Sequence, residues 1–333
     1  MAEVHPMARY PVFMRVALVF LGVILAGAPV TLAQMAGPVT RIDAPGATTT
    51  WLNGINAAGQ IVGCGSDIMG GSSHGFVYAG GRFTTIDVPG AGANGTCANG
   101  INDVGQIVGD YYGPGDFFTG KAHGFMLAAG RFTTIDVPGA AESFANGINN
   151  AGQIVGYYED AAKKEHGFML AAGRFTTIDA PGATETSAYS INNSAQIVGS
   201  YKDAAGIPHG FLLAAGRFTT IDVPGVGTDY IGVFGINDAG QIVGHDGRGP
   251  YRGFVVKLES RAGVGSTPSA RASSVTIATI DAPGAARTAA LGINGAGQIV
   301  GHFMDAGGKF HGYLRTAGGT FTTFDAPGAT RTA

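Results

Sequence analysis

Histidine recurs at one position of a repeated motif, where imidazole nitrogens could bind zinc or transfer protons. In the fifth copy, however, Arg252 takes this place. The motif also begins a segment rich in aromatic and aliphatic residues, where His can cap or stack. We therefore interpret the histidines as structural, and we expect neither a metal site nor a cofactor. The five histidines are His74, His123, His166, His209 and His311.

Two further polar residues recur in each repeat and could in principle surround a cation. Each Asn begins an Asn-x-x-Gly or related turn, and each Asp precedes a Pro-Gly turn, which explains both residue types. Calcium would need six or more converging oxygens. We assign both sets to turns. The asparagines are Asn56, Asn102, Asn149, Asn192, Asn237 and Asn294, and the aspartates include Asp87, Asp136, Asp179 and Asp222.

Aromatic residues lie beside carboxylates in the segments that differ most between repeats. Aromatic rings stack on sugar rings, and polar groups hydrogen-bond to sugar hydroxyls. We therefore expect these segments to form loops on one face that bind an extracellular glycan or protein. The alternative is that the rings only pack over the edges of sheets. The candidate ligand-binding residues are Tyr111, Tyr112, Phe117, Tyr157, Tyr158, Tyr201, Tyr251 and Phe303.

The elements that must position these residues are predicted by one repeat of roughly forty-five residues. In the third copy, the segment from Asn149 to Gly152 is typical of a type I turn with a left-handed glycine, which joins two strands. Residues 166–170 and 174–179 are rich in β-branched and aromatic residues, which favours two more strands. Each repeat is therefore predicted to be a four-stranded antiparallel sheet.

The fourth copy departs from this turn pattern, because Ala195 stands where the other copies have glycine. If the turn is as assigned, Ala195 takes a positive φ at a cost of about 1 kcal/mol. We therefore expect the substitution Ala195→Gly to raise the melting temperature.

Six complete repeats predict an all-β fold, a six-bladed β-propeller, with a β-solenoid as the alternative. The Ile-Val and Phe-Met-Leu runs do not alternate strictly with polar residues, which indicates strands covered on both faces. Closure of the ring would remove exposed sheet edges, with residues 39–43 or 321–325 as the closing outer strand. We assign residues 34–333 to this one domain, with a loop insertion at residues 257–274.

Residues 1–33 have the pattern of a secretory signal peptide. Basic residues precede an apolar run at residues 16–28, which is shorter than the roughly twenty residues that span a bilayer, and small residues follow up to Ala33. An uncleaved anchor is the alternative. We expect a secreted, extracellular or periplasmic protein, without stable membrane insertion after cleavage.

The two cysteines, Cys64 and Cys97, lie in adjoining repeats. In an oxidising compartment they can form a disulfide between neighbouring blades. Two buried free cysteines are the alternative, since pairing requires Cα atoms within about 7 Å of each other.

Charge and motifs limit the function further. The net charge of −3 and the isoelectric point near 6.2 do not suggest a nucleic acid partner. The sequence contains no Gly-x-Ser-x-Gly elbow, His-Glu-x-x-His motif or phosphate-binding loop. We therefore assign no catalytic residue.

The motif Gly-Ile-Asn-x-x-Gly-Gln-Ile-Val-Gly, followed by a His-small-Phe triplet, resembles the HAF-repeat family of extracellular bacterial repeat proteins. The resemblance covers residues 41–333. It implies an exported protein of unassigned activity and supplies no catalytic residues. We expect a binding module. The alternatives are a hydrolase or lyase that acts on extracellular polysaccharide at the mouth of the channel, and a structural surface protein.

Overall fold

The computed structural model describes residues 41–322, except residues 43, 45–46, 48, 67–72, 93–94, 115–120, 223–230, 248–250 and 259–274. The predicted signal peptide and Phe117 therefore lie outside the described residues. Within the described ranges, no helix is long and apolar enough to cross a bilayer.

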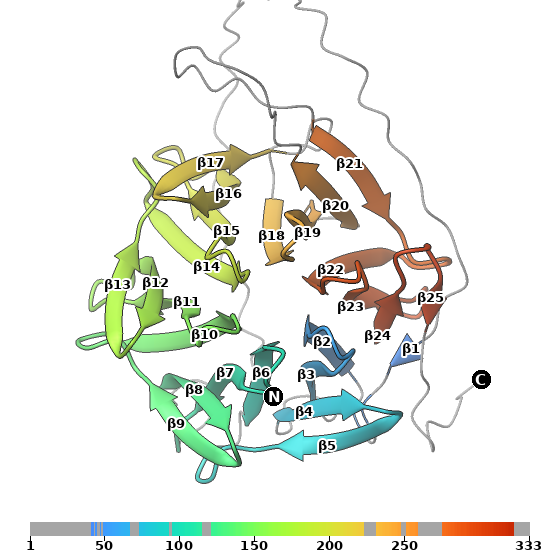
Figure 1. Ribbon diagram of the computed structural model, residues 1–333, viewed down its shortest axis with the longest axis horizontal. Helices are drawn as coiled ribbons and strands as arrows, with labels where there is room; N and C mark the ends of the chain where they lie inside the picture. Colours follow the sequence, from blue (N-terminus) through green and yellow to red (C-terminus); the bar gives the residue numbers. More distant parts are fainter. Residues whose placement is uncertain are drawn as a thin grey trace, which may run out of the picture.

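Six antiparallel sheets surround a common axis, as Figure 1 shows. The first three are β2 (Thr49–Ile55), β3 (Ile61–Ser66), β4 (Ser73–Ala79) and β5 (Arg82–Ile86); β6 (Thr96–Ile101), β7 (Ile107–Tyr112), β8 (Ala122–Ala128) and β9 (Arg131–Ile135); and β10 (Glu142–Ile148), β11 (Ile154–Glu159), β12 (Glu165–Ala171) and β13 (Arg174–Ile178). The next two are β14 (Glu185–Ile191), β15 (Ile197–Lys202), β16 (Pro208–Ala214) and β17 (Arg217–Ile221); and β18 (Ile231–Ile236), β19 (Gln241–Asp246), β20 (Arg252–Leu258) and β21 (Val275–Ile280). The sixth contains β22 (Arg287–Ile293), β23 (Ile299–Met304), β24 (Phe310–Arg315), β25 (Phe321–Thr322) and β1 (Arg41–Ile42). The predicted six-bladed β-propeller is confirmed, and the solenoid alternative is wrong.

Local turn chemistry produces each blade. In the third blade, the Gly152 amide donates to the Asn149 carbonyl at 3.0 Å, and Gly152 has a φ of 72°. This is the expected type I turn with a left-handed glycine, and it joins β10 to β11. The Ala183 amide donates to the Ala180 carbonyl at 3.0 Å across a Pro-Gly turn, which leads from the outer strand of one blade to the inner strand of the next.

The hydrophobic core lies between successive blades. One cluster combines Val108 and Ile135 of the second blade with Ile148, Ile154 and Phe168 of the third. The glycine that ends each Gln-Ile-Val-Gly motif makes this packing possible. At Gly156, a Cβ atom would collide with the Phe144 carbonyl oxygen and approach the Phe168 ring. The inner strand and the buried Phe therefore require a residue without a side chain here.

Both ends of the described chain complete the sixth blade. Residues Arg41 and Ile42 of β1 pair with Tyr313 and Gly312 of β24. The next two positions of β24 pair with Phe321 and Thr322 of β25. The outer strand of this blade is thus formed by two segments, one from each end of the described chain. Both segments that the sequence offered as closing strands contribute to it.

Two predicted boundaries differ from the structure. The second strands run two or three residues past the Gln-Ile-Val-Gly motif, so most of the candidate aromatic residues lie in strands instead of loops. The predicted insertion begins within β20, because Lys257 pairs with Thr276 and Leu258 with Val275. Residues 259–274 lie outside the described residues.

Candidate functional site

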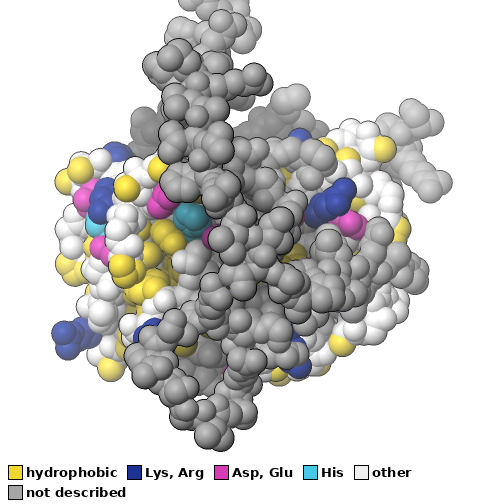
Figure 2. Space-filling model, turned by 90° about the horizontal axis from the view of Figure 1, so that it is seen from above, with side chains coloured by type: hydrophobic (Ala, Val, Ile, Leu, Met, Phe, Trp, Pro, Cys, Tyr) yellow, Lys and Arg dark blue, Asp and Glu magenta, His cyan; other side chains and the backbone are white. Residues whose placement is uncertain are grey.

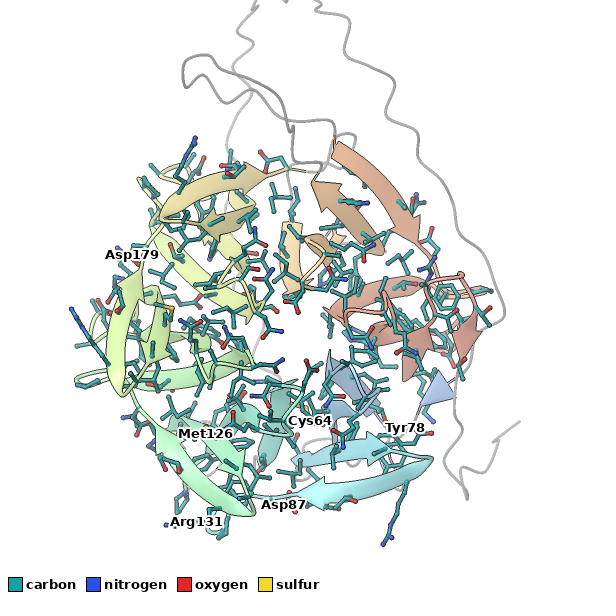
Figure 3. All side chains as sticks on the ribbon, viewed as in Figure 1. Cys64, Tyr78, Asp87, Met126, Arg131 and Asp179 are labelled. Carbon is teal, nitrogen blue, oxygen red and sulfur yellow. A yellow bond between two sulfur atoms is a disulfide. The ribbon has the colours of Figure 1, made fainter. Side chains whose placement is uncertain are left out.

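The recurrent His and Asp form one pair per blade in the first four blades. The Nδ1 atom of each His lies within hydrogen-bond distance of the Asp carboxylate, at 3.0, 2.8, 2.9 and 2.9 Å in chain order. The pairs are His74 with Asp87, His123 with Asp136, His166 with Asp179, and His209 with Asp222. The antiparallel pairing of the third and fourth strands brings them together, since the His begins one strand and the Asp follows the other. Figure 3 shows Asp87 and Asp179 at the periphery of the ring.

The four Asp residues lie directly before Pro-Gly turns, and their carboxylates contact the histidines. In the turn after Asp179, the Ala180 amide donates instead to the Thr186 hydroxyl of the next blade, at 3.1 Å. The carboxylate is directed to the histidine. At His209, burial opposes the charged ring, but hydrogen bonds and charges from Asp222 and then Asp203 raise its pKa above the ordinary value.

Four candidate aromatic residues each stack on a recurrent histidine of their own blade. Tyr111, Tyr158 and Tyr201 stack on their histidines with ring centroids 5.1–5.3 Å apart. Their hydroxyl groups contact Thr134, Thr177 and Thr220. Phe303 stacks on His311 in the same way and is buried. These four rings therefore pack on histidines, as the packing alternative predicts, and their role in ligand binding stays a prediction. In the rim view of Figure 2, a hydrophobic patch borders a histidine and acidic side chains.

The six recurrent asparagines form a closed cycle around the axis. Each side-chain amide donates to the backbone carbonyl of the corresponding Asn in the next blade, at 2.9–3.1 Å, and the last donor, Asn294, returns to Asn56. Each Asn carbonyl oxygen also accepts from the backbone of its own turn. The asparagines therefore serve the predicted turns and also link all six blades.

A β-bulge in each inner strand aims one further side chain at the channel, because the register shifts at the same place in every blade. Three of these residues are asparagines, and the amide of Asn53 donates to the Ala98 carbonyl at 3.1 Å. The other three are Tyr189, Phe234 and Leu291. One half of the channel wall is thus polar, and the other half is mainly apolar.

A second, asymmetric cavity lies between the first, second and sixth blades. It adjoins the channel, because Asn53 and Leu291 line both. Its volume is about 380 Å³, and its lining includes Trp51, Ser73, Asp110, Tyr112 and His302. The disulfide between Cys64 and Cys97 joins the first two blades in its wall, with Cα atoms 4.9 Å apart. Figure 3 shows Cys64 on the inner side of the ring.

One sequence position supplies much of the chemistry near this cavity. The residue after Gln-Ile-Val-Gly is different in almost every blade. Burial raises the pKa of Asp110 to about 6, although a hydrogen bond from Asn99 opposes the shift. Burial lowers the pKa of His245 to about 4 and that of His302 to about 3, where the charge of His245 adds to the effect. The six residues are Cys64, Asp110, Tyr157, Ser200, His245 and His302.

The remaining described candidate rings are Tyr157, Tyr251 and Tyr112. Tyr157 stacks on Phe144, with centroids 4.6 Å apart, and burial raises its pKa strongly. Tyr251 contacts His245 and His302. Tyr112 lines the axial cavity. Among the described His, Cys, Asp and Glu side chains, no three are grouped closely enough to hold a metal ion.

Sequence reasoning missed Trp51, Asp110 and His302 as members of one cavity. An available signal was that a single repeat position varies between Cys, Asp, Tyr, Ser and His, although the Gln-Ile-Val-Gly motif before it stays constant. It also missed the His–Asp pairs. Their signal was the constant spacing of 13 residues in four successive repeats.

The fold is shared with proteins of known structure that include a lectin. A fucose-specific lectin from Aleuria aurantia superposes with a TM-score of 0.51 at 13% identity, covering 87% of this chain and 100% of that chain. A mutant of the Aleuria aurantia lectin in complex with Fucα1-6GlcNAc gives 0.52 at 14% identity, with the same coverage. AofleA from Arthrobotrys oligospora gives 0.50 at 12% identity, covering 90% of this chain and 96% of that chain. No family model and no curated protein sequence matches the chain.

Proposed function

We propose that the protein is an exported carbohydrate-binding propeller that holds a sugar ring in the axial cavity. The observation that carries this proposal is the convergence of an indole, a carboxyl group, an imidazole and a hydroxyl in one cavity, from Trp51, Asp110, His302 and Ser73. An aromatic wall with a few polar groups is the composition that sugar recognition requires. The glycan-binding lectins that share the fold support the same class of ligand.

The disulfide supports export. Disulfides form and persist in oxidising compartments such as the periplasm and the extracellular space. The bond between Cys64 and Cys97 is therefore consistent with the predicted signal peptide at residues 1–33. Membership of the HAF-repeat family stays a prediction that rests on the repeat motif.

Binding is favoured over catalysis by the carboxyl groups available. Most glycoside hydrolases use two carboxyl groups about 5–9.5 Å apart. Asp110 is the one carboxyl group among the described residues that line the axial cavity. We therefore expect saturable binding of a glycan without release of new reducing ends.

The test uses the fluorescence of Trp51, which is the single tryptophan of the chain. A glycan array identifies ligands, and titration with each one should shift Trp51 emission to a saturating value. Trp51→Ala should abolish binding on the array. Phe144→Ala removes a ring at the corresponding position of the third blade, outside the cavity lining, and should preserve binding.

Three results would contradict the proposal. Unchanged binding by Trp51→Ala would place the glycan elsewhere. Reducing sugar released from a polysaccharide would support the hydrolase alternative, and a new unsaturated product would support the lyase. The absence of any saturable ligand would favour a structural surface protein.

A further inference from the structure

The first blade lacks the aromatic ring that covers the His–Asp pair in three other blades. Gly65 occupies the position that Tyr111, Tyr158 and Tyr201 occupy in the second, third and fourth blades, as the strand registers show. In each of the four blades this residue pairs with the His of the third strand. The pair His74 and Asp87 is nevertheless formed, at 3.0 Å.

Exposure of the histidine shows the effect of the missing ring. The side chains of His123, His166 and His209 are 23%, 15% and 21% exposed beneath their tyrosines. The side chain of His74 is 51% exposed. The face of the imidazole that a tyrosine covers elsewhere is therefore open in the first blade.

A cavity of about 460 Å³ lies at this place. Its described lining includes Gly65, His74, Phe83, Thr85 and Asp87. Cavities of roughly 150 Å³ already bind benzene when their walls are apolar. Phe76 and Phe83 also line the cavity, and they keep the edge-to-face contact that the corresponding Phe pairs make in the second and third blades.

The other blades define what fits such a cavity. In the second, third and fourth blades a p-hydroxyphenyl ring stacks on the histidine, and its hydroxyl contacts the Thr two positions before the Asp, at 3.2, 3.3 and 2.9 Å. The first blade retains this threonine as Thr85, in the cavity wall. The stacking partner and the hydroxyl partner are thus both present, and the ring is absent. Ala44 and Ala47 also line the cavity and lie close over Gly65, where a Cβ atom would approach their Cβ atoms to 3.2 and 2.9 Å.

We propose that this cavity of the first blade, the blade-1 pocket, binds a p-hydroxyphenyl group supplied from outside the propeller fold. The ring stacks on His74, and its hydroxyl hydrogen-bonds to the Thr85 Oγ1 atom. The source is either the side chain of a tyrosine in a partner chain or a free phenol. This site is separate from the axial cavity, because the two share no described lining residue.

Ligand-observed NMR and calorimetry with p-cresol test the proposal. The full chain should bind one p-cresol, and toluene, which lacks the hydroxyl, should bind at least about tenfold more weakly. N-acetyl-L-tyrosinamide distinguishes the two sources. If it binds, the pocket admits a ring carried on a peptide backbone, whereas binding of p-cresol alone assigns the pocket to a free phenol.

Two variants locate the ligand. Thr85→Val should weaken p-cresol binding to the level of toluene, while the matched variant Thr134→Val in the second blade, where Tyr111 already fills the space, should leave it unchanged. Tyr201→Gly should create a second pocket of the same kind. It should therefore raise the stoichiometry to two, and p-cresol should recover part of the melting temperature that the substitution lowers.

Two outcomes would overturn the proposal. Wild-type protein that binds no p-cresol, although Tyr201→Gly binds one, would show that the blade-1 pocket is closed to the ring. Binding that Thr85→Val leaves unchanged would place the phenol at another site. Neither result bears on glycan binding, which is read from Trp51.

Discussion

Buried titratable groups near the axial cavity give the protein opposing responses to pH. The folded-state pKa of His302 is about 3 and that of His245 about 4, whereas an unfolded chain has histidines near 6.5. The unfolded state therefore binds more protons as the pH falls below 6.5, and stability decreases. Asp110 acts oppositely. Its folded pKa of about 6 exceeds the unfolded 3.8, so stability rises as the pH falls from 6 towards 4.

We predict that His302→Gln removes part of the acid destabilisation. The urea midpoint of the wild-type protein should fall between pH 6.5 and pH 4, and that of the variant should fall less steeply. Asp110→Asn should have the reverse effect, a steeper fall, because it removes the compensating group. Identical pH profiles for His302→Gln and wild type would show that His302 is not held neutral in the folded state.

Ala195 carries backbone strain at a position that is glycine in the other blades. Its φ is 56°, and its amide donates to the Asn192 carbonyl at 3.0 Å, so the expected turn is formed with an unfavourable residue. We predict that Ala195→Gly raises the melting temperature by about 2 °C, since relief of about 1 kcal/mol shifts a domain of this size by that order. Gly152→Ala in the third blade should lower it. A decrease with Ala195→Gly, measured by calorimetry, would contradict this account.

Residues were predictable where their role is local. The Asn-x-x-Gly and Pro-Gly turns depend on nearby residues, so their positions follow from sequence. The surroundings of a strand residue, in contrast, depend on which face of its sheet packs against a neighbouring blade. Tyr157 and Tyr158 are adjacent in sequence, yet one points to the fourth blade and the other packs on the core shared with the second. Their separation into two environments required the structure.

Asparagines in the turns between the first and second strands link neighbouring blades. Asn149 is buried, and its side-chain amide donates to the Asn192 backbone carbonyl at 3.1 Å and to the Gln153 side-chain oxygen at 2.7 Å. Its side-chain oxygen accepts from the backbone amide of Gln153. Loss of this side chain leaves the buried Asn192 carbonyl and the partly buried Gln153 groups without these bonds. Each such group costs about 1–3 kcal/mol.

We predict that Asn149→Ala lowers the free energy of unfolding by about 3 kcal/mol, as measured in urea. The neighbouring Asn150 is exposed and contacts Asp103 of the adjoining blade. Asn150→Ala should therefore cost about 0.5 kcal/mol. Equal effects of the two substitutions would show that the cycle of buried asparagines contributes nothing beyond an ordinary turn.

Closure of the ring is a property of the whole molecule. The edge of β24 is covered by β1 along one half and by β25 along the other. A chain that begins at Ala44 lacks β1 and exposes the backbone of Gly312 and Tyr313. An exposed strand edge promotes association with other chains.

We predict that this truncated chain melts at a lower temperature and self-associates in light scattering. A chain that begins at Arg41 keeps β1 and serves as the control. If the two truncated chains behaved alike, β1 would not contribute to closure.

The number of blades was predictable because the repeat can be counted. The composite outer strand was not predictable. Residues 39–43 and residues 321–325 both match the same motif, so the sequence does not indicate which of the two segments closes the ring. The ring accommodates both by giving each half of one strand. Likewise, the pairing of Cys64 with Cys97 required the distance between two blades.

The position that follows each Gln-Ile-Val-Gly motif has a consequence for how such a protein diversifies. Six side chains at corresponding places differ in chemistry, while the glycine before them and the core around them are retained. One side chain at this position can therefore be substituted, in evolution or by design, while the fold of the blade is retained. A small library randomised at these codons should yield folded variants with altered ligand preference.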